Sequence, residues 1–176
     1  MIDAGYAATM ARYNRWMNER LYALCAGLPE AERRRERGAF FGSIHATLDH
    51  IVYADLAFLS RFTGDPPEPP ELGVELHAGF EALRAARAAL DARLVDWAGA
   101  LDDAWLRAPL RYASKVDGRV RTLPRWLLVA HVFNHQTHHR GQVTTLLAQL
   151  GLDVGSTDLP FMPGVEALEP GAPAAA

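Results

Sequence analysis

Four of the chain's seven histidines lie in one stretch, HVFNHQTHHRGQ, which runs from position 131 to position 142. They are His131, His135, His138 and His139. If the stretch is helical, each residue turns the chain by about 100°, and the four imidazoles share one arc of the helix. His131 and His135 are spaced i,i+4, as are His135 and His139, so each pair lies on one face. Two histidines placed in this way can bind one metal ion without backbone strain.

A zinc-like ion needs at least one protein ligand beyond such a pair. Because the chain has a single cysteine, we expect the missing ligand to be a histidine on another helix. His45 and His50 are the candidates, and because they are five residues apart their directions differ by about 140°. His45 lies beside the apolar stripe of its segment, whereas His50 lies on the side that carries Ala46, Ala54 and Ala57. Periodicity leaves the choice between them open.

Bulk properties exclude several classes of protein. The 176 residues, 49% of them hydrophobic, suit one domain with a sizeable core. The net charge of −3 argues against a nucleic-acid partner, which needs clustered Lys and Arg. Cys25 alone forms no intrachain disulfide, and no segment has the apolar length of a membrane span. The N-terminus lacks the pattern of a secretory signal, so we expect a soluble cytoplasmic protein.

The histidines must be positioned by helices, and four segments show apolar residues at three- and four-residue spacing. The first runs from Ile2 to Leu28, and the second begins at Ser43, whose hydroxyl can cap it. The third is predicted from Val74 to Ala100, and the fourth from Pro124 to Leu150, where Gly151 ends it. We therefore predict an all-α protein with a four-helix bundle.

Two of the predicted helical stripes each contain one charged residue. Asp55 belongs to the stripe of the second segment, and Arg87 to that of the third. His77 lies beside the third stripe, near its predicted start, and is expected at the surface. The basic run ERRRER, before the second helix, mixes signs and is interpreted as a solvated face rather than an anion site.

The segments between the helices carry different signals. GDPPEPP, at 64–70, predicts a stiff, extended connection. Residues 106–123 alternate apolar and polar types around Asp117-Gly118, which predicts a short β-hairpin with a type I′ turn before the last helix. Residues 153–163 are expected to be an irregular segment that covers the bundle. We predict one domain over 1–163 and a flexible Pro/Ala-rich tail over 164–176.

Several segments together resemble the DinB family of damage-inducible proteins, which is distinct from the polymerase that shares the name. They are YNRWMNERL, FFGSIHATLDHIVYADLAFLSRFTG, HVFNHQTHHRGQ and GLDVGSTDLPF, and the resemblance spans about residues 3 to 163. It implies a four-helix bundle with a divalent metal at a three-histidine site. The residues that match the family's ligands are His50, His135 and His139. The family usually has an asparagine before the first ligand, and this chain has Asp49 instead.

The remaining polar residues of the site are expected to support these ligands. His45, His131 and His138 are candidates for contacts around the metal, as is Gln142, since ligating imidazoles usually donate their second N–H to a fixed partner. Three protein nitrogens would leave positions open to water or substrate, which favours catalysis over a structural role. Several divalent metals suit three imidazoles, and zinc or nickel is expected. No catalytic side chain beyond the ligands is identified.

Three functional hypotheses follow. In the first, which the resemblance favours, the protein is a metal-dependent enzyme. It would be either an S-transferase that uses a low-molecular-weight thiol or a hydrolase, with a small-molecule substrate. In the second, it is a stress-response protein that binds a metal without turnover. In the third, it is a metal-free helical interaction module. The resemblance also implies a homodimer.

Overall fold

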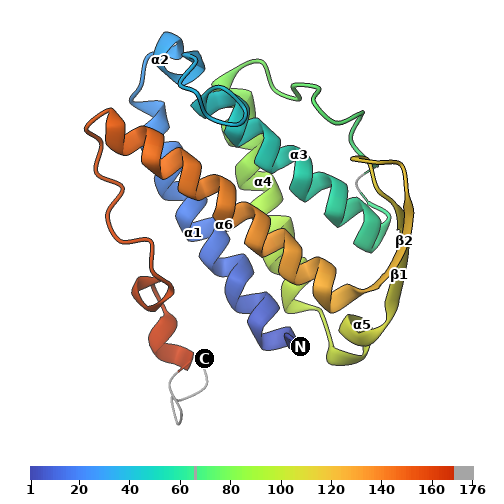
Figure 1. Cartoon of the computed structure of the whole chain (residues 1–176). Coiled ribbons are helices and arrows are strands. Elements are labelled where there is room, and N and C mark those ends of the chain that lie inside the picture. The colour runs from blue at the N-terminus through green and yellow to red at the C-terminus, as the bar shows by residue number, and fades with distance from the viewer. Residues whose placement is uncertain (66, 169–176) are drawn as a thin grey trace.

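The computed structural model describes residues 1–65 and 67–168, and within them the predicted four-helix bundle is confirmed (Figure 1). The four long helices are α1 (Ala4–Ala26), α3 (Ile44–Thr63), α4 (Phe80–Gly99) and α6 (Arg125–Gln149). Two short helices, α2 (Glu30–Arg34) and α5 (Asp103–Arg107), lie in the connections.

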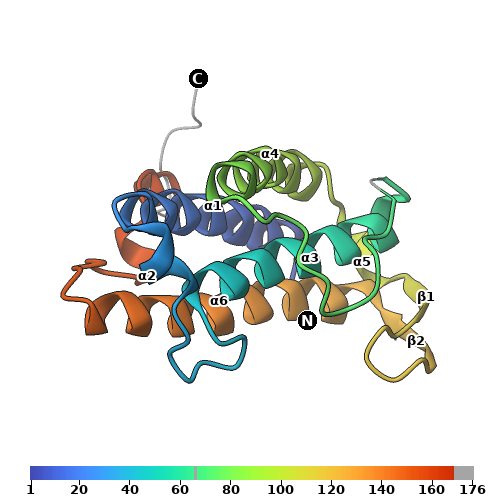
Figure 2. The same cartoon turned by 90° about the horizontal axis from the view of Figure 1, so that it is seen from above.

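The long helices form two layers, with α1 beside α4 in one and α3 beside α6 in the other (Figure 2). Their apolar faces meet in a core that includes Leu21, Leu48, Leu90, Phe133 and Leu147, each at most 3% exposed. Because α3 and α6 are neighbours, side chains on their facing sides can meet. None of the helices in the described part of the chain has the length and apolar character needed to cross a membrane.

The ends of the helices follow the predicted chemistry. The Ser43 hydroxyl accepts a hydrogen bond from the backbone N–H of Ala46 at 3.2 Å, which confirms it as the cap of α3. Gly64 ends α3 in the left-handed region, with φ of 79°, where an L side chain would be strained. Pro124 stands immediately before α6 rather than inside its first turn.

The connection between α3 and α4 is longer than predicted, because α4 begins at Phe80 and not at Val74. The residues from 74 to 79 instead continue the extended connection, which returns along α3 to the end of the bundle where that helix begins (Figure 1). The Asp49 carboxylate takes the backbone N–H groups of Leu76 and His77, at 2.7 and 3.1 Å. These two hydrogen bonds tie the connection to α3 at the residues just before α4 begins.

The predicted hairpin is present, but its turn differs. Strands β1 (Pro109–Ala113) and β2 (Val120–Pro124) pair antiparallel, with Leu110 opposite Leu123. A type I′ turn needs positive φ at both central residues. Gly118 has φ of 69°, but the φ of Asp117 is not positive. The strands are instead joined by a longer loop over 114–119, in which the N–H of Gly118 donates to the carbonyl of Ser114 at 2.8 Å. The prediction of a two-residue type I′ turn was therefore wrong.

After α6 the chain runs back along α1 as an irregular segment, as predicted, with short 3₁₀ turns η1 (Leu159–Phe161) and η2 (Val165–Leu168). The Tyr13 hydroxyl donates to the carbonyl oxygen of Thr157 at 2.6 Å, and this bond ties the segment to α1. The first residues of the predicted tail thus form η2, and its remainder, from 169 to 176, lies outside the described residues.

Candidate metal centre

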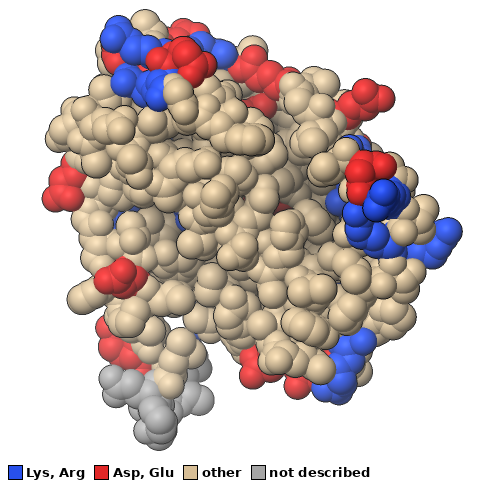
Figure 3. All heavy atoms as spheres, viewed as in Figure 1, with Lys and Arg blue, Asp and Glu red and all other residues tan. Residues whose placement is uncertain are grey.

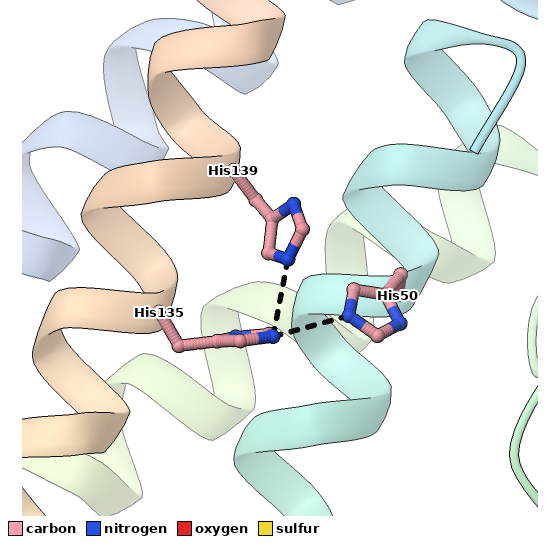
Figure 4. Close-up of side chains that lie close together, drawn as sticks. All are labelled: His50, His135 and His139. Atoms are coloured by element: carbon pink, nitrogen blue, oxygen red, sulfur yellow. Dashed lines mark hydrogen bonds between the residues drawn. The ribbon is translucent and has the colours of Figure 1, made fainter. Parts of the chain in front are cut away.

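Three histidines from two facing helices converge at one point between α3 and α6 (Figure 4). His50 extends from α3, and His135 and His139 extend from successive turns of α6. The Nε2 atom of His135 lies 3.2 Å from that of His50 and 3.1 Å from that of His139. All three candidate ligand nitrogens fall within 4.8 Å of one another. The arrangement could therefore bind a metal ion.

The two nitrogen–nitrogen distances from His135 fit the ligand spacing around a divalent cation. Metal–nitrogen bonds of about 2.0–2.1 Å in a tetrahedral arrangement put neighbouring ligand atoms about 3.3 Å apart. Each ring nitrogen of a neutral imidazole is either one donor or one acceptor. Hydrogen bonding among three Nε2 atoms at one point can therefore pair two of them and leaves the third without a partner. One cation that accepts three lone pairs would satisfy them all.

Gln142 sets the proton position on one of the three rings. Its Oε1 lies 2.9 Å from Nδ1 of His139. An amide oxygen only accepts, so Nδ1 of His139 must carry the proton, which leaves the lone pair on Nε2 facing the other two histidines. The amide Nε2 of Gln142 lies 3.3 Å from Nε2 of His138 and can donate to it. Gln142 thus occupies the supporting position that the sequence predicts.

The surroundings keep the three imidazoles neutral. Burial, followed by the neighbouring charge of His139, lowers the pKa of His50 to about 4. Burial and then the same neighbour lower the pKa of His135 to about 3, and burial also lowers the pKa of His139. Phe41 covers one face of the group, with its ring stacked on that of His50 at a centroid distance of 3.8 Å. Metal binding requires neutral imidazole, so the site favours the protonation state that ligation needs.

The structure distinguishes His45 from His50 as the candidate third ligand. His45 is not part of the group of three; it is 1% exposed and points to another side of the helix. Its Nε2 lies 2.8 Å from the carbonyl oxygen of His77 and 3.0 Å from a carboxylate oxygen of Glu75. These contacts fasten α3 to the connection before α4, so the structure gives His45 a structural role.

The two other histidines of the α6 stretch border the group. His131 lies one turn before His135, with ring centroids 5.7 Å apart, and its ring also lies 5.2 Å from that of Phe58. His138 is exposed, and its ring centroid is 4.7 Å from that of His139. Neither belongs to the set of three whose nitrogens converge.

Two cavities open beside the histidine group, and His50 and Tyr53 line both. The first, of about 180 Å³, includes the charged side chains of Arg34, Asp49 and Glu75 in its lining. The second, of about 280 Å³, runs along α3 toward the hairpin. Its lining residues are His50, Tyr53, Ala54, Ala57, Phe58, Arg61, Leu72, Tyr112, Ser114, Lys115, Val116, His131 and His135. A ligand in either cavity would lie next to a candidate metal ligand.

The surface above α3 and α6 carries few charges (Figure 3). On the face shown, Lys and Arg gather over α2, over the hairpin and at the lower right, and Asp and Glu lie among those over α2 and the hairpin (Figure 3). They do not form a continuous basic stripe there of the kind that follows a nucleic-acid backbone.

Sequence reasoning gave no role to several residues of this region. Phe41 belongs to the FFGS segment that carries the resemblance, but its type alone does not reveal the stacking on His50. Ala54 and Ala57, which the sequence puts on the same side of the helix as His50, line the larger cavity. The signal that could have found that cavity is the position of these small residues on the same face as His50.

Comparisons with known proteins agree with this geometry. Residues 1–171 match the family model described as the DinB family. The chain is also 28% identical over 159 residues to a protein named Protein DinB from Bacillus subtilis (strain 168). That similarity covers 87% of this chain and 91% of the relative.

Proposed function

This chain belongs to the DinB family, and we propose that it is a divalent-metal-dependent enzyme whose ion is held by His50, His135 and His139. The observation that carries the proposal is the convergence of three Nε2 atoms from α3 and α6. Three nitrogen ligands leave coordination positions for water or substrate, whereas structural zinc sites usually have four protein ligands. The cavities on either side of His50 supply space for a substrate.

Each part of the chain has a task in this proposal. His50, His135 and His139 hold the ion, and Gln142 keeps the lone pair of His139 directed at it. Phe41 excludes water from one face of His50. A divalent ion in this position would supply Lewis acidity, which lowers the pKa of a bound water or thiol and makes it a nucleophile near neutral pH.

The reaction class that we favour is transfer of a low-molecular-weight thiol to an electrophile, with hydrolysis as the alternative. Two cavities that meet at His50 suit a reaction with two organic substrates. A metal-binding protein without turnover would need the ion but not the cavities. Zinc or nickel is the expected metal. We further propose a cytoplasmic homodimer, which light scattering on the purified protein would test.

Metal analysis on protein made without a histidine tag tests the central proposal. The wild-type chain should bind one divalent ion, and His135→Asn should lose it. His138→Asn is the matched control, because His138 lies on the same helix but outside the group of three. Absence of stoichiometric metal under zinc and nickel loading would overturn the proposal, as would equal metal content in the two variants.

A further inference from the structure

The larger cavity follows one face of α3 for about three turns. His50, Ala54, Ala57 and Arg61 are spaced at i, i+4, i+7 and i+11, which puts them on the same side of the helix. At 1.5 Å per residue, the two ends of this row are about 16 Å apart along the helix axis. The row begins at the histidine group, has small side chains in the middle, and ends at a cation.

The walls of the cavity are apolar and come from separate parts of the chain. Phe58 of α3 lies 5.2 Å, between ring centroids, from His131 of α6. Tyr112 and Val116 contribute from the hairpin and its loop, and Leu72 from the connection before α4. The hairpin thus closes a cavity that the four long helices alone would leave open. Aromatic and aliphatic walls of this kind favour the body of an organic ligand over water.

Arg61 is the most buried charge in this cavity. Its side chain is 8% exposed, and the guanidinium lies over the rings of Phe58 and Tyr112, at 5.1 and 5.2 Å from their centroids. Within the described residues, its hydrogen bonds are limited to one from Nε to Glu68, at 3.3 Å. The Arg61 guanidinium has five N–H donors, so most of them are free for a further acceptor.

The balance of charge at this end of the cavity is positive. The single carboxylate of Glu68 is shared by Arg61 and Lys115, each with a closest nitrogen–oxygen distance of 3.3 Å. Glu68 itself is about half exposed, with 45% of its side chain accessible, so water weakens its compensation of the buried guanidinium. Two cations and one anion leave an excess of one positive charge beside the apolar walls.

We infer that this cavity binds an organic carboxylate with an apolar or aromatic body, its carboxylate on the Arg61 guanidinium. The body would lie over Ala54 and Ala57, and the opposite end would reach the histidine group. That the ligand reacts at its end near the histidine group rests on the proposed function. Binding of its carboxylate to Arg61 does not. The cavity would thereby select the electrophilic substrate of the proposed reaction and fix its orientation.

The probe that tests this is 4-phenylbutyrate, compared with the neutral 4-phenylbutanamide of the same shape. Binding is followed by titration in two-dimensional NMR or by calorimetry, on metal-loaded protein and on protein kept metal-free with a chelator. The carboxylate should bind about tenfold more tightly than the amide in both states, because a charge-assisted bond to a buried guanidinium replaces a neutral one. Arg61→Gln should abolish that preference while leaving the amide within about twofold.

Further variants separate binding in the cavity from other causes. Ala54→Leu fills the middle of the cavity and should weaken both probes by about tenfold. Lys115 also donates to the carbonyl of Pro70 at 3.2 Å, so its charge acts on the ligand from a distance. Lys115→Gln should therefore reduce the carboxylate preference by less than Arg61→Gln does. Arg93→Gln is the matched control, since Arg93 pairs with Asp65 on the surface, outside the lining of the cavity.

Three outcomes overturn the inference: equal affinity for the two probes, a preference unchanged by Arg61→Gln, or a preference that disappears when the metal is removed. The last would place the carboxylate on the ion instead. If the protein binds metal but not the carboxylate, this inference fails and the proposed function stands. If it binds the carboxylate through Arg61 but no metal, the proposed function fails and the cavity assignment stands.

Discussion

The Asp49 carboxylate and the His77 imidazole are bonded to each other across the long connection between α3 and α4, with Oδ1 and Nδ1 2.8 Å apart. The same carboxylate accepts the backbone N–H groups of Leu76 and His77. His77 is therefore not the surface residue that the sequence predicted, since only 20% of its side chain is exposed. Asp49 directly precedes His50, so these three hydrogen bonds, called the Asp49 clasp below, also hold the wall of the smaller cavity beside the candidate metal centre.

Replacing Asp49 with asparagine should weaken the clasp. An amide has a single acceptor oxygen, whereas the carboxylate serves three N–H donors, so at least one donor would be left without its partner. We expect Asp49→Asn to reduce the free energy of unfolding by about 1–3 kcal/mol, measured by urea denaturation. Hydrogen exchange at the amides of Leu76 and His77 should become faster.

Asp96→Asn is the matched control, because Asp96 is an exposed aspartate of α4. Its effect should stay within about 0.5 kcal/mol of zero. Unchanged stability and unchanged exchange in Asp49→Asn would show that the clasp contributes nothing.

The fold was predictable to the extent that local patterns determine it. The helical spacing of apolar residues identified all four long helices, and Ser43 and Gly151 marked ends of α3 and α6. The start of α4 was not predictable from spacing, because Leu76 fits the helical stripe but lies in the extended connection, which a bond to Asp49 ties to α3. That bond joins residues far apart in the chain, and no local propensity encodes it.

The candidate site was predictable where it depends on local spacing, but not where it depends on how the helices pack. Spacing along α6 put His135 and His139 on one face, but the choice between His45 and His50 depends on how α3 is rotated against α6. The resemblance to the family supplied that choice, and the structure brings His50 to the group. The cavity toward Arg61 depends on the hairpin loop and on the path of the connection, which are tertiary features without a sequence period.

The bond between Gln142 and His139 leads to a second prediction. Removing the amide releases the His139 ring and its proton position, because Oε1 of Gln142 is the acceptor that fixes both. Gln142→Leu should lower the affinity for zinc by about 10- to 100-fold. A competition assay with a chelating dye measures this directly.

Gln149→Leu provides the comparison, because Gln149 is exposed at the end of the same helix. Its metal affinity should match that of the wild type. Equal affinity in Gln142→Leu and wild type would mean that the ring is held by other contacts.

A third prediction concerns the two charged residues in the apolar stripes. Arg87 bonds to Asp55, and its Nη2 lies 2.8 Å from Oδ1 of Asp91. All three side chains are at most 3% exposed, so the cation neutralises carboxylates that water cannot reach. Arg87→Met should reduce the free energy of unfolding by about 3–5 kcal/mol, since it leaves buried charges uncompensated.

Calorimetric or urea unfolding measures the loss, and Arg84→Met controls for arginine removal from α4. Arg84 is half exposed and pairs with Glu81 at 3.9 Å, so its loss should change stability by less than about 1 kcal/mol. Adding Asp55→Asn to Arg87→Met should recover part of the loss, because it removes one uncompensated carboxylate. If the two single arginine variants were equally stable, the buried network would not stabilise the bundle.

The last prediction concerns the stability of the metal-free protein as the pH falls. The pKa of His50 is lowered to about 4 and that of His135 to about 3, mainly by burial, whereas an unfolded histidine titrates near 6.5. Below about pH 6.5 the unfolded chain therefore takes up protons that the folded chain refuses, so the free energy of unfolding must decrease. This loss should extend down to about pH 4, where the folded histidines begin to protonate as well.

Urea unfolding in the presence of a chelator, from about pH 7.5 down to about pH 4.5, measures the slope. His135→Asn should have a smaller slope than the wild type, because one of the depressed imidazoles is absent. Hydrogen bonds from Arg121 and Ser114 hold the pKa of the Asp117 carboxylate below its usual range, so Asp117 contributes to the slope only below about pH 5, where the unfolded carboxylate begins to take up protons. A free energy that stays constant or rises on acidification would contradict the burial of neutral imidazoles between α3 and α6.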